Sequence, residues 1–234
     1  MQLKLATYNI RRCIGSDGQK NPDRISEVLA EINPDILALQ EVEYVHTVDD
    51  IDFTGKDTSL YKMLGPTMLL GQSNYGNVLV SRFPPVAIRK INLSYPGRER
   101  RGALDVDLDC RGTVVRVIAT HLGLRPVERR NQARKLLAVI DDPALKRDIT
   151  ILMGDMNEWF LWGRPLRWIH DYFGSSRDVA TYPARFPVLA LDKIWCHPAP
   201  LLIRLRKHRT RLAGIASDHL PLVGYVDLSE SRSL

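Results

Sequence analysis

The sequence predicts a layered α/β or α+β domain in which loops from two sheets converge on one rim. Three observations predict it. Short apolar segments typical of strands recur along all 234 residues, they outnumber the helical segments, and polar residues of catalytic type stand just after several strand ends. The segments expected as strands are 3–10, 36–40, 76–81, 103–108, 113–120, 149–153, 190–195 and 220–226.

Two segments are expected to be helices. The clearer one spans 22–32, because Asn21 can cap its first turn, Pro22 suits the first helical position and Asn33 with Pro34 ends it. Its apolar residues form one stripe: Ile25, Val28, Leu29 and Ile32. A second helix is expected from about Val127 to Ile140.

The composition is that of an ordinary globular protein. Hydrophobic residues make up 44% and charged residues 26%, which excludes disordered, collagenous and coiled-coil classes. The 33 Lys and Arg exceed the 27 Asp and Glu, which gives a net charge of +6. We find no repeat and no linker that would divide the chain. We therefore expect one catalytic domain over residues 1–228, followed by a polar tail at 229–234.

The sequence favours a cytoplasmic protein without a transmembrane segment. No apolar run approaches the ~18 residues that a membrane span needs. The first residues enter a strand pattern at once, without the apolar run of a signal peptide. Cys13, Cys110 and Cys196 are odd in number and lack metal-binding spacing, so free thiols are expected.

Six short segments place an acidic, amide or imidazole side chain directly after or before a strand. Each is weak by itself, because Asn and Asp at strand ends are usually turn formers. In chain order they are Thr7-Tyr8-Asn9-Ile10, Leu39-Gln40-Glu41, Thr120-His121-Leu122, Gly154-Asp155-Met156-Asn157, Leu191-Asp192-Lys193-Ile194 and Ser217-Asp218-His219. Their order and chemistry together are far more informative than any one of them.

This series resembles the endonuclease/exonuclease/phosphatase superfamily, which includes DNase I, exonuclease III-type repair nucleases, neutral sphingomyelinases and inositol polyphosphate 5-phosphatases. The resemblance runs from Asn9 to His219. Within the superfamily, the chain is similar to small bacterial members of unassigned substrate. It implies a DNase I-like fold, in which two packed mixed β-sheets are flanked by helices. It also implies hydrolysis of a phosphate ester by a divalent-metal enzyme.

Metal chemistry is expected from the oxygen donors of these segments. Cleavage of a phosphate ester needs neutralised phosphate oxygens, an activated water and a stabilised leaving oxygen. Hard oxygen ligands suit Mg²⁺, for which Mn²⁺ can substitute. We expect Glu41 as the principal ligand, Asn9 beside the metal or on the phosphate, and Asp218 as a ligand through water. Whether one or two metal ions bind stays open.

His219 is the expected general base, because a neutral imidazole can take a proton from water near physiological pH. Asp192 would hold its tautomer and orientation, as a buried carboxylate does in other hydrolases. The alternative for Asp192 is a salt bridge to Lys193 or a turn at the strand end. By the resemblance, Asp155 and Asn157 position the attacking water and the phosphate.

The resemblance also gives His121 a role, as a contact to the scissile phosphate. The alternative is a histidine that satisfies a backbone group. Repair nucleases of abasic sites carry a Tyr-containing segment there, so DNA repair is disfavoured. Arg129 and Gln132 match a family pattern that braces the following helix, and Asn77 would point into the site unless it only forms a turn.

The substrate class is less determined. Basic groups such as Arg98 to Arg101, and the aromatic run that begins at Trp159, could follow a nucleic acid or meet a lipid surface. Solvated charges and buried aromatic rings are the simpler interpretation. The favoured function is a phosphodiesterase or nuclease. A phospholipid or phosphoinositide phosphoesterase is the alternative, and a non-catalytic binding protein ranks last. No obligate protein partner is evident.

Overall fold

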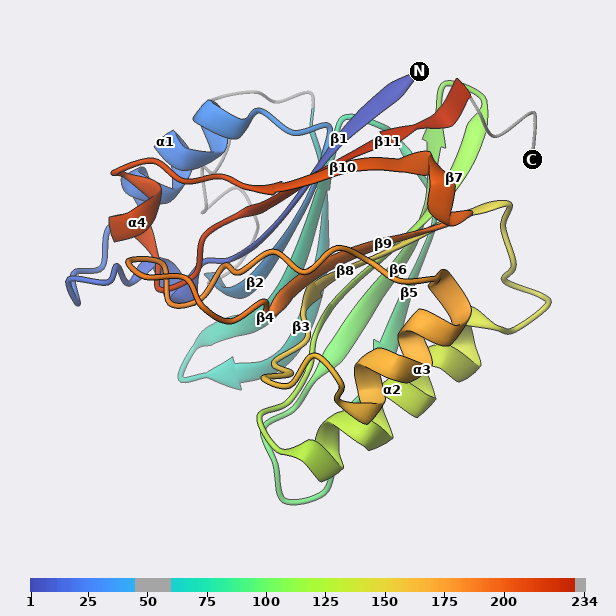
Figure 1. Ribbon diagram of the computed structural model, residues 1–234. Helices are drawn as coiled ribbons and strands as arrows, with labels where there is room; N and C mark the ends of the chain where they lie inside the picture. The colour runs from blue at the N-terminus through green and yellow to red at the C-terminus, as the bar shows by residue number, and fades with distance from the viewer. Residues whose placement is uncertain (45–59, 230–234) are drawn as a thin grey trace.

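The computed structural model describes residues 1–44 and 60–229, and these form two mixed β-sheets packed face to face with helices on both outer sides (Figure 1). This confirms the predicted architecture. The first sheet has the order β10-β11-β1-β2-β4-β3 and the second the order β5-β6-β7-β8-β9. The strands of the first sheet are β1 (Gln2–Asn9), β2 (Ile36–Tyr44), β3 (Tyr61–Leu70), β4 (Ser73–Ser81), β10 (Leu202–Lys207) and β11 (Leu222–Asp227). Those of the second are β5 (Pro85–Asn92), β6 (Gly102–Cys110), β7 (Thr113–His121), β8 (Ile149–Asp155) and β9 (Asp192–His197).

The central core lies between the two sheets. Leu3 and Leu5 of β1 pack into it with apolar residues of the second sheet, whereas Ala6 and Tyr8 of β1 pack on the opposite side against α1 (Pro22–Ile32). Successive side chains of a strand point to opposite faces, so a strand covered on both faces is buried at every position. That is why β1 is buried continuously from Leu5 to Asn9.

The helices cover the outer faces. Helix α1 and the short α4 (Ala213–Ala216) lie on the first sheet, and α2 (Pro126–Ile140) and α3 (Arg164–Phe173) lie side by side on the second (Figure 1). The predicted cap of α1 is present, because the side chain of Asn21 accepts hydrogen bonds from the backbone N–H groups of Asp23 and Arg24. Asn33 ends this helix in the left-handed conformation.

Several elements differ from the sequence-based expectation. The eight expected strands are present with ends shifted by a few residues, but β3, β5, β10 and α3 were not expected. The three cysteines are free and buried, as expected. Within the described residues, no helix is long and apolar enough to cross a membrane. Most of the expected polar tail lies outside the described residues.

Strand pairing brings the predicted polar residues to one rim. Strands β1 and β2 are parallel, with Asn9 paired to Gln40, and β7 and β8 are parallel, with His121 paired to Asp155. In the antiparallel pair of β8 and β9, Asp155 stands opposite Asp192. Because parallel strands end at the same sheet edge, residues that are far apart in the sequence meet there.

Candidate active site

A cavity of about 390 Å³ opens at this rim. Of the predicted site residues, all except Asp192 and Asn77 line it. Its lining consists of Asn9, Arg12, Glu41, Met68, Tyr75, Glu99, Arg101, His121, Leu124, Asp155, Asn157, Trp159, Tyr182, Leu191, Asp218 and His219. A concave site with convergent acidic, amide and imidazole groups is typical of an enzyme active site.

Gly154 allows the end of β8 to pack closely against β7, which places Asp155 at the cavity. Gly154 has a φ of 148°, and a Cβ there would lie 1.8 Å from the backbone oxygen of Thr120 on β7. Only glycine permits this close approach of two backbones. Asn157 follows with a φ of 51°, a conformation that Asn tolerates, and its backbone N–H donates to Asp155 Oδ1 at 2.9 Å. The backbone thus fixes one side of the Asp155 carboxylate.

Glu41 is placed by a β-bulge. The register between β2 and β4 jumps from Leu39 paired with Val78 to Val42 paired with Gly76, so Gln40 and Glu41 together oppose Asn77. Glu41 has a φ of 57°, in the left-handed region. An extra residue in a strand changes the direction of a side chain. The bulge turns Glu41 into the cavity.

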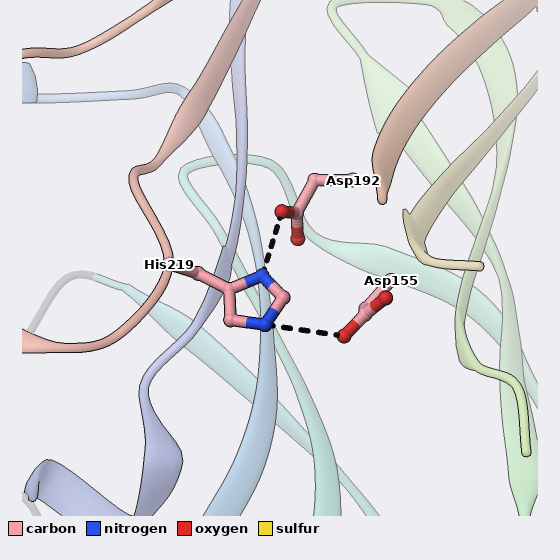
Figure 2. A group of neighbouring side chains, drawn as sticks. All are labelled: Asp155, Asp192 and His219. Carbon is pink, nitrogen blue, oxygen red and sulfur yellow. Dashed lines mark hydrogen bonds and ion pairs between the residues drawn. The ribbon is translucent and has the colours of Figure 1, made fainter. Parts of the chain in front are cut away.

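Asp192, His219 and Asp155 form a row in which a hydrogen bond joins the first two and an ion pair joins the last two (Figure 2). His219 Nδ1 donates to Asp192 Oδ2 at 2.8 Å, and its Nε2 lies 3.7 Å from Asp155 Oδ2. Thr181 Oγ1 also donates to Asp192 Oδ2, at 2.6 Å. The alternative partner, Lys193, pairs with Asp178 instead. Asp192 therefore lies behind the imidazole and contacts it directly, in the arrangement expected from the sequence.

The protonation of His219 differs from the expectation of a neutral ring. Burial opposes its positive charge most strongly, but the carboxylates of Asp192 and Asp155 outweigh burial and raise the pKa of His219 to about 10. The pKa of Asp155 is raised to about 6, mainly by burial. In the free protein at neutral pH, His219 is therefore an imidazolium held between two carboxylates.

This charge state gives a prediction about pH. We expect NMR titration of the six histidines to show one ring that stays protonated well above pH 7, and we expect its signal to be absent from His219→Gln. A raised folded-state pKa contributes stability that is complete below about pH 6.5 and is lost as the pH rises through about 10. The stability difference between wild type and His219→Gln should accordingly shrink from pH 7 to 10. A ring that titrates near 6.5 would contradict the assignment.

His121 is held in the neutral form. Burial, with Arg101 and His219 nearby, lowers its pKa well below the ordinary value. Arg101 Nη1 lies 3.0 Å from His121 Nδ1, and because a guanidinium can only donate, Nδ1 is the acceptor. A neutral ring accepts at one nitrogen only, and Arg101 is the charged donor, so we assign the single ring proton to Nε2, which lies 3.5 Å from the acceptor Asp155 Oδ2. Asn157 Nδ2 lies 2.9 Å from Nε2 but also only donates, and it donates to the backbone oxygen of Leu122. A fixed N–H donor thus borders the cavity beside Asp155.

Asn9 joins the acidic groups on the other side of the cavity. Its Nδ2 donates to Glu41 Oε1 and to Asp155 Oδ2, each at 3.1 Å, while its Oδ1 accepts from the backbone N–H of Arg11. Asn9 therefore lies beside the expected metal position, and its side-chain oxygen is already engaged. Asp218 lines the same cavity and forms an ion pair of 3.4 Å with Arg11.

These residues fit a hard divalent cation. Glu41, Asp155 and Asp218 present carboxylates to one cavity, and no cysteine is among its lining residues. Asp155, Asp192 and His219 also have ligand atoms within 4.8 Å of one another. In that second group, however, Asp192 and His219 Nδ1 already bond to each other. The carboxylate oxygens of Glu41 and Asp218 are therefore more available to a metal ion.

Arg129 and Gln132 brace α2, as expected. Arg129 pairs with Glu158 and donates to the backbone oxygen of Leu124, and Gln132 Oε1 accepts from the backbone N–H of Gly123. Their side chains connect α2 to the loops around the cavity and are not among the lining residues.

Two expectations need correction. Asn77 does not face the cavity, because it lies inside β4 and its Nδ2 donates to the backbone oxygen of Gly102 at 2.9 Å. It joins the two sheets. The aromatic run after Asn157 is exposed, contrary to the simpler expectation of burial, since Gly163 closes a tight turn onto Phe160 and no neighbouring loop among the described residues covers it. Trp159 borders the cavity as expected.

Two residues of the site were missed by sequence reasoning. Arg101 was grouped with surface basic residues, but it is buried and bonds to His121. Tyr182 packs against His219 with ring centroids 4.8 Å apart and the ring planes inclined by 48°, and it lines the cavity. Its only signal in the sequence is the Tyr-Pro pair before Leu191.

Comparisons with known proteins identify the family and agree with the fold. The model of the Endonuclease/Exonuclease/phosphatase family matches residues 6–219. The chain is 28% identical over 227 residues to the uncharacterized protein YbhP of Escherichia coli K12, covering 87% of each chain. Among solved structures, an endonuclease/exonuclease/phosphatase of Beutenbergia cavernae superposes with a TM-score of 0.77 at 23% identity, covering 97% of this chain and 72% of that one. One from Bacteroides vulgatus gives 0.77 at 18%, covering 97% and 99%.

Proposed function

The chain belongs to the endonuclease/exonuclease/phosphatase family, whose members are hydrolases of phosphoester bonds, and we propose that it is a divalent-metal-dependent phosphodiesterase that uses water as the nucleophile. One observation carries the proposal: His219, with Asp192 bonded behind it, Asp155 and the N–H of His121 border the same cavity as the carboxylates of Glu41 and Asp218. We assign the activity to residues 1–228 acting as one domain.

The metal would be held by Glu41 and Asp218, with Asn9 fixing the direction of Glu41. When bound, Mg²⁺ supplies positive charge that neutralises the phosphate oxygens and offsets the carboxylates that favour the His219 imidazolium. The remaining steps belong to the chain's own side chains.

We assign proton transfer to the row of Asp192, His219 and Asp155. The cavity face of the row is formed by Asp155 Oδ2 and His219 Nε2, which lie 3.7 Å apart. A water held by both has Asp155 as a proton acceptor, and His219 Nε2 becomes a second acceptor once the imidazolium has given up its Nε2 proton. Asp192 keeps Nδ1 of His219 protonated, which leaves Nε2 as the nitrogen that can release and take up a proton. We propose that His219 acts as the base from this position and that Asp155 and Asn157 orient the water and the phosphate.

Negative charge on the phosphate oxygen is stabilised by the N–H of His121, a donor that is already oriented. The Nε2–H of His121 is held by Arg101 and needs no reorientation as negative charge grows on the phosphate oxygen. A preorganised donor of this kind stabilises the transition state more than the bound substrate. The presence of Glu41, Asp155, Asp218, His121 and His219 at one cavity disfavours a non-catalytic binding protein.

Metal dependence tests the proposal. We expect hydrolysis of bis-p-nitrophenyl phosphate to be abolished by EDTA and restored by Mg²⁺ or Mn²⁺, because the cavity offers oxygen ligands to such ions. Glu41→Gln should weaken metal binding while the fold is retained. Glu43→Gln is the matched control, since Glu43 lies on the same strand but pairs with Lys20 outside the cavity. Full activity after removal of all divalent ions would disprove the metal mechanism.

The same assay distinguishes the substrate classes expected from the sequence. Plasmid DNA, single-stranded RNA, inositol phosphates and phospholipid vesicles share the phosphate ester and differ in what surrounds it. If the protein is a nuclease, we expect it to cleave the DNA or the RNA. Turnover on vesicles alone is the outcome for a phospholipid phosphoesterase, a candidate favoured by the exposed aromatic loop at the cavity mouth.

A further inference from the structure

Five large apolar side chains form an exposed patch at the mouth of the cavity. Trp159, Phe160, Leu161 and Trp162 follow one another in the loop between β8 and α3, and Leu124 lies in the loop between β7 and α2. Their exposed fractions are 59%, 55%, 45%, 73% and 65%, in that order. Single exposed apolar residues are common, but such a contiguous group usually marks an interaction surface. We call these five residues the apolar ridge.

The ridge is held in place by buried polar contacts. Arg129 donates to Glu158, directly before the aromatic run, and to the backbone oxygen of Leu124, so one side chain connects the two loops. The N–H of Phe160 donates to Glu158, and the N–H of Gly163 donates to the oxygen of Phe160. The apolar side chains therefore remain exposed on a loop whose backbone is well anchored.

The exposed charges of the two segments that carry the ridge, 122–140 and 157–170, have one sign, whereas the exposed Glu99 lines the cavity outside these segments and the exposed Asp171 follows the second segment in α3. Segments 122–140 and 157–170 contain two acidic residues, Glu128 and Glu158, and both are buried. The exposed or half-exposed charged residues of the same segments are all basic: Arg125, Arg130, Arg134, Lys135, Arg164 and Arg167. An apolar edge flanked by arginines complements an anionic surface that has an apolar interior.

We propose that the apolar ridge inserts into the interface of an anionic phospholipid membrane and presents the cavity to phosphodiesters of the headgroup layer. This rests on the proposed function and specifies its substrate class. Trp159 and Leu124 belong both to the ridge and to the cavity lining, so a bilayer that meets the ridge also meets the cavity mouth.

A single-stranded nucleic acid fits the ridge less well. Bases stack on separate aromatic faces, whereas Leu161 and Leu124 are aliphatic and the rings of Phe160 and Trp162 pack on each other, with centroids 5.4 Å apart. Tryptophan with neighbouring aliphatic residues is typical of side chains that enter the membrane interface.

Vesicle binding tests the proposal, with the full-length protein and Mg²⁺. We expect binding to phosphatidylcholine vesicles containing 30% phosphatidylglycerol, with a blue shift of tryptophan emission, because Trp159 and Trp162 are exposed whereas Trp195 is buried. Phe160→Ser with Trp162→Ser should weaken binding at least tenfold and reduce the shift. Val86→Ser with Ile203→Ser is the matched control, since these exposed apolar residues lie on the outer strands β5 and β10, and it should bind as wild type does.

Four outcomes decide between the explanations. Equal binding by the ridge variant and wild type, or binding to single-stranded DNA but not to vesicles, would overturn the proposal. Loss of vesicle binding and of vesicle hydrolysis in the ridge variant, with bis-p-nitrophenyl phosphate still hydrolysed, would support it. Absence of hydrolysis of the soluble diester by wild type would refute the proposed function, and it would leave vesicle binding as a separate result.

Discussion

Replacing His219 with alanine is expected to lower turnover of a phosphodiester by at least ~10²-fold, the lower end of the range for general acid–base catalysis. The ring lies between Asp192 and Asp155 and is the imidazole that both carboxylates contact. Its loss removes the proton acceptor from the cavity while the metal-side carboxylates remain. Metal affinity should therefore change far less than turnover.

A double-mutant cycle shows whether Asp192 and His219 act as one unit. Asp192→Asn changes the partner of His219 Nδ1 while leaving the volume of the side chain nearly the same. If the carboxylate acts only through the imidazole, the double variant should be about as slow as His219→Ala alone. Asp178→Asn is the control, because Asp178 pairs with Lys193 rather than with His219. Two losses that multiply would show that the residues act independently.

The family resemblance carried by the order of polar residues predicted which side chains meet, and sheet geometry explains why they do. Asn9, His121 and Asp155 each end a strand, and parallel neighbours end at one edge. The apolar stripe and the capping Asn21 likewise predicted α1 with both of its ends. Local patterns were sufficient wherever the structure repeats a regular period.

The rest depended on contacts between distant segments. The bulge at Glu41 is defined by its pairing with β4, and the inward turn of Arg101 by the position of His121. The charge of His219 depends on two carboxylates that come from other strands. No local pattern contains these relations.

Missed strands have a different explanation. Strand β5 is the outer strand of its sheet and is half-exposed, and β10 is an outer strand with three basic residues in its six. Basic residues protect outer strands from pairing with other chains, and they also make such strands look like loops in a sequence. Helix α3 places the buried Leu166, Ile169 and Phe173 at helical spacing, a stripe as clear as that of α1, so this helix could have been predicted from the sequence.

Replacing His121 with alanine is expected to lower turnover by about 10²- to 10³-fold, the usual effect of removing one preorganised donor to a developing negative charge. Substrate binding should weaken less, because the N–H bonds more strongly to the transition state than to the ground state. His121→Gln keeps a side-chain N–H and should retain more activity than His121→Ala. Normal turnover combined with a lowered melting temperature would identify a structural histidine instead.

A substitution of Arg101 distinguishes a catalytic His121 from a structural one. Its Nη1 donates to His121 Nδ1, so it is a positioning residue that keeps the proton of the neutral ring on Nε2. Arg101→Met removes this donor, and nitrogen NMR of the His121 ring should then show a mixture of tautomers. We expect kcat to fall by about tenfold with little change in KM, because only the fraction of rings with Nε2–H can meet the phosphate oxygen. If His121 had only a structural role, the tautomer would shift while kcat stayed the same.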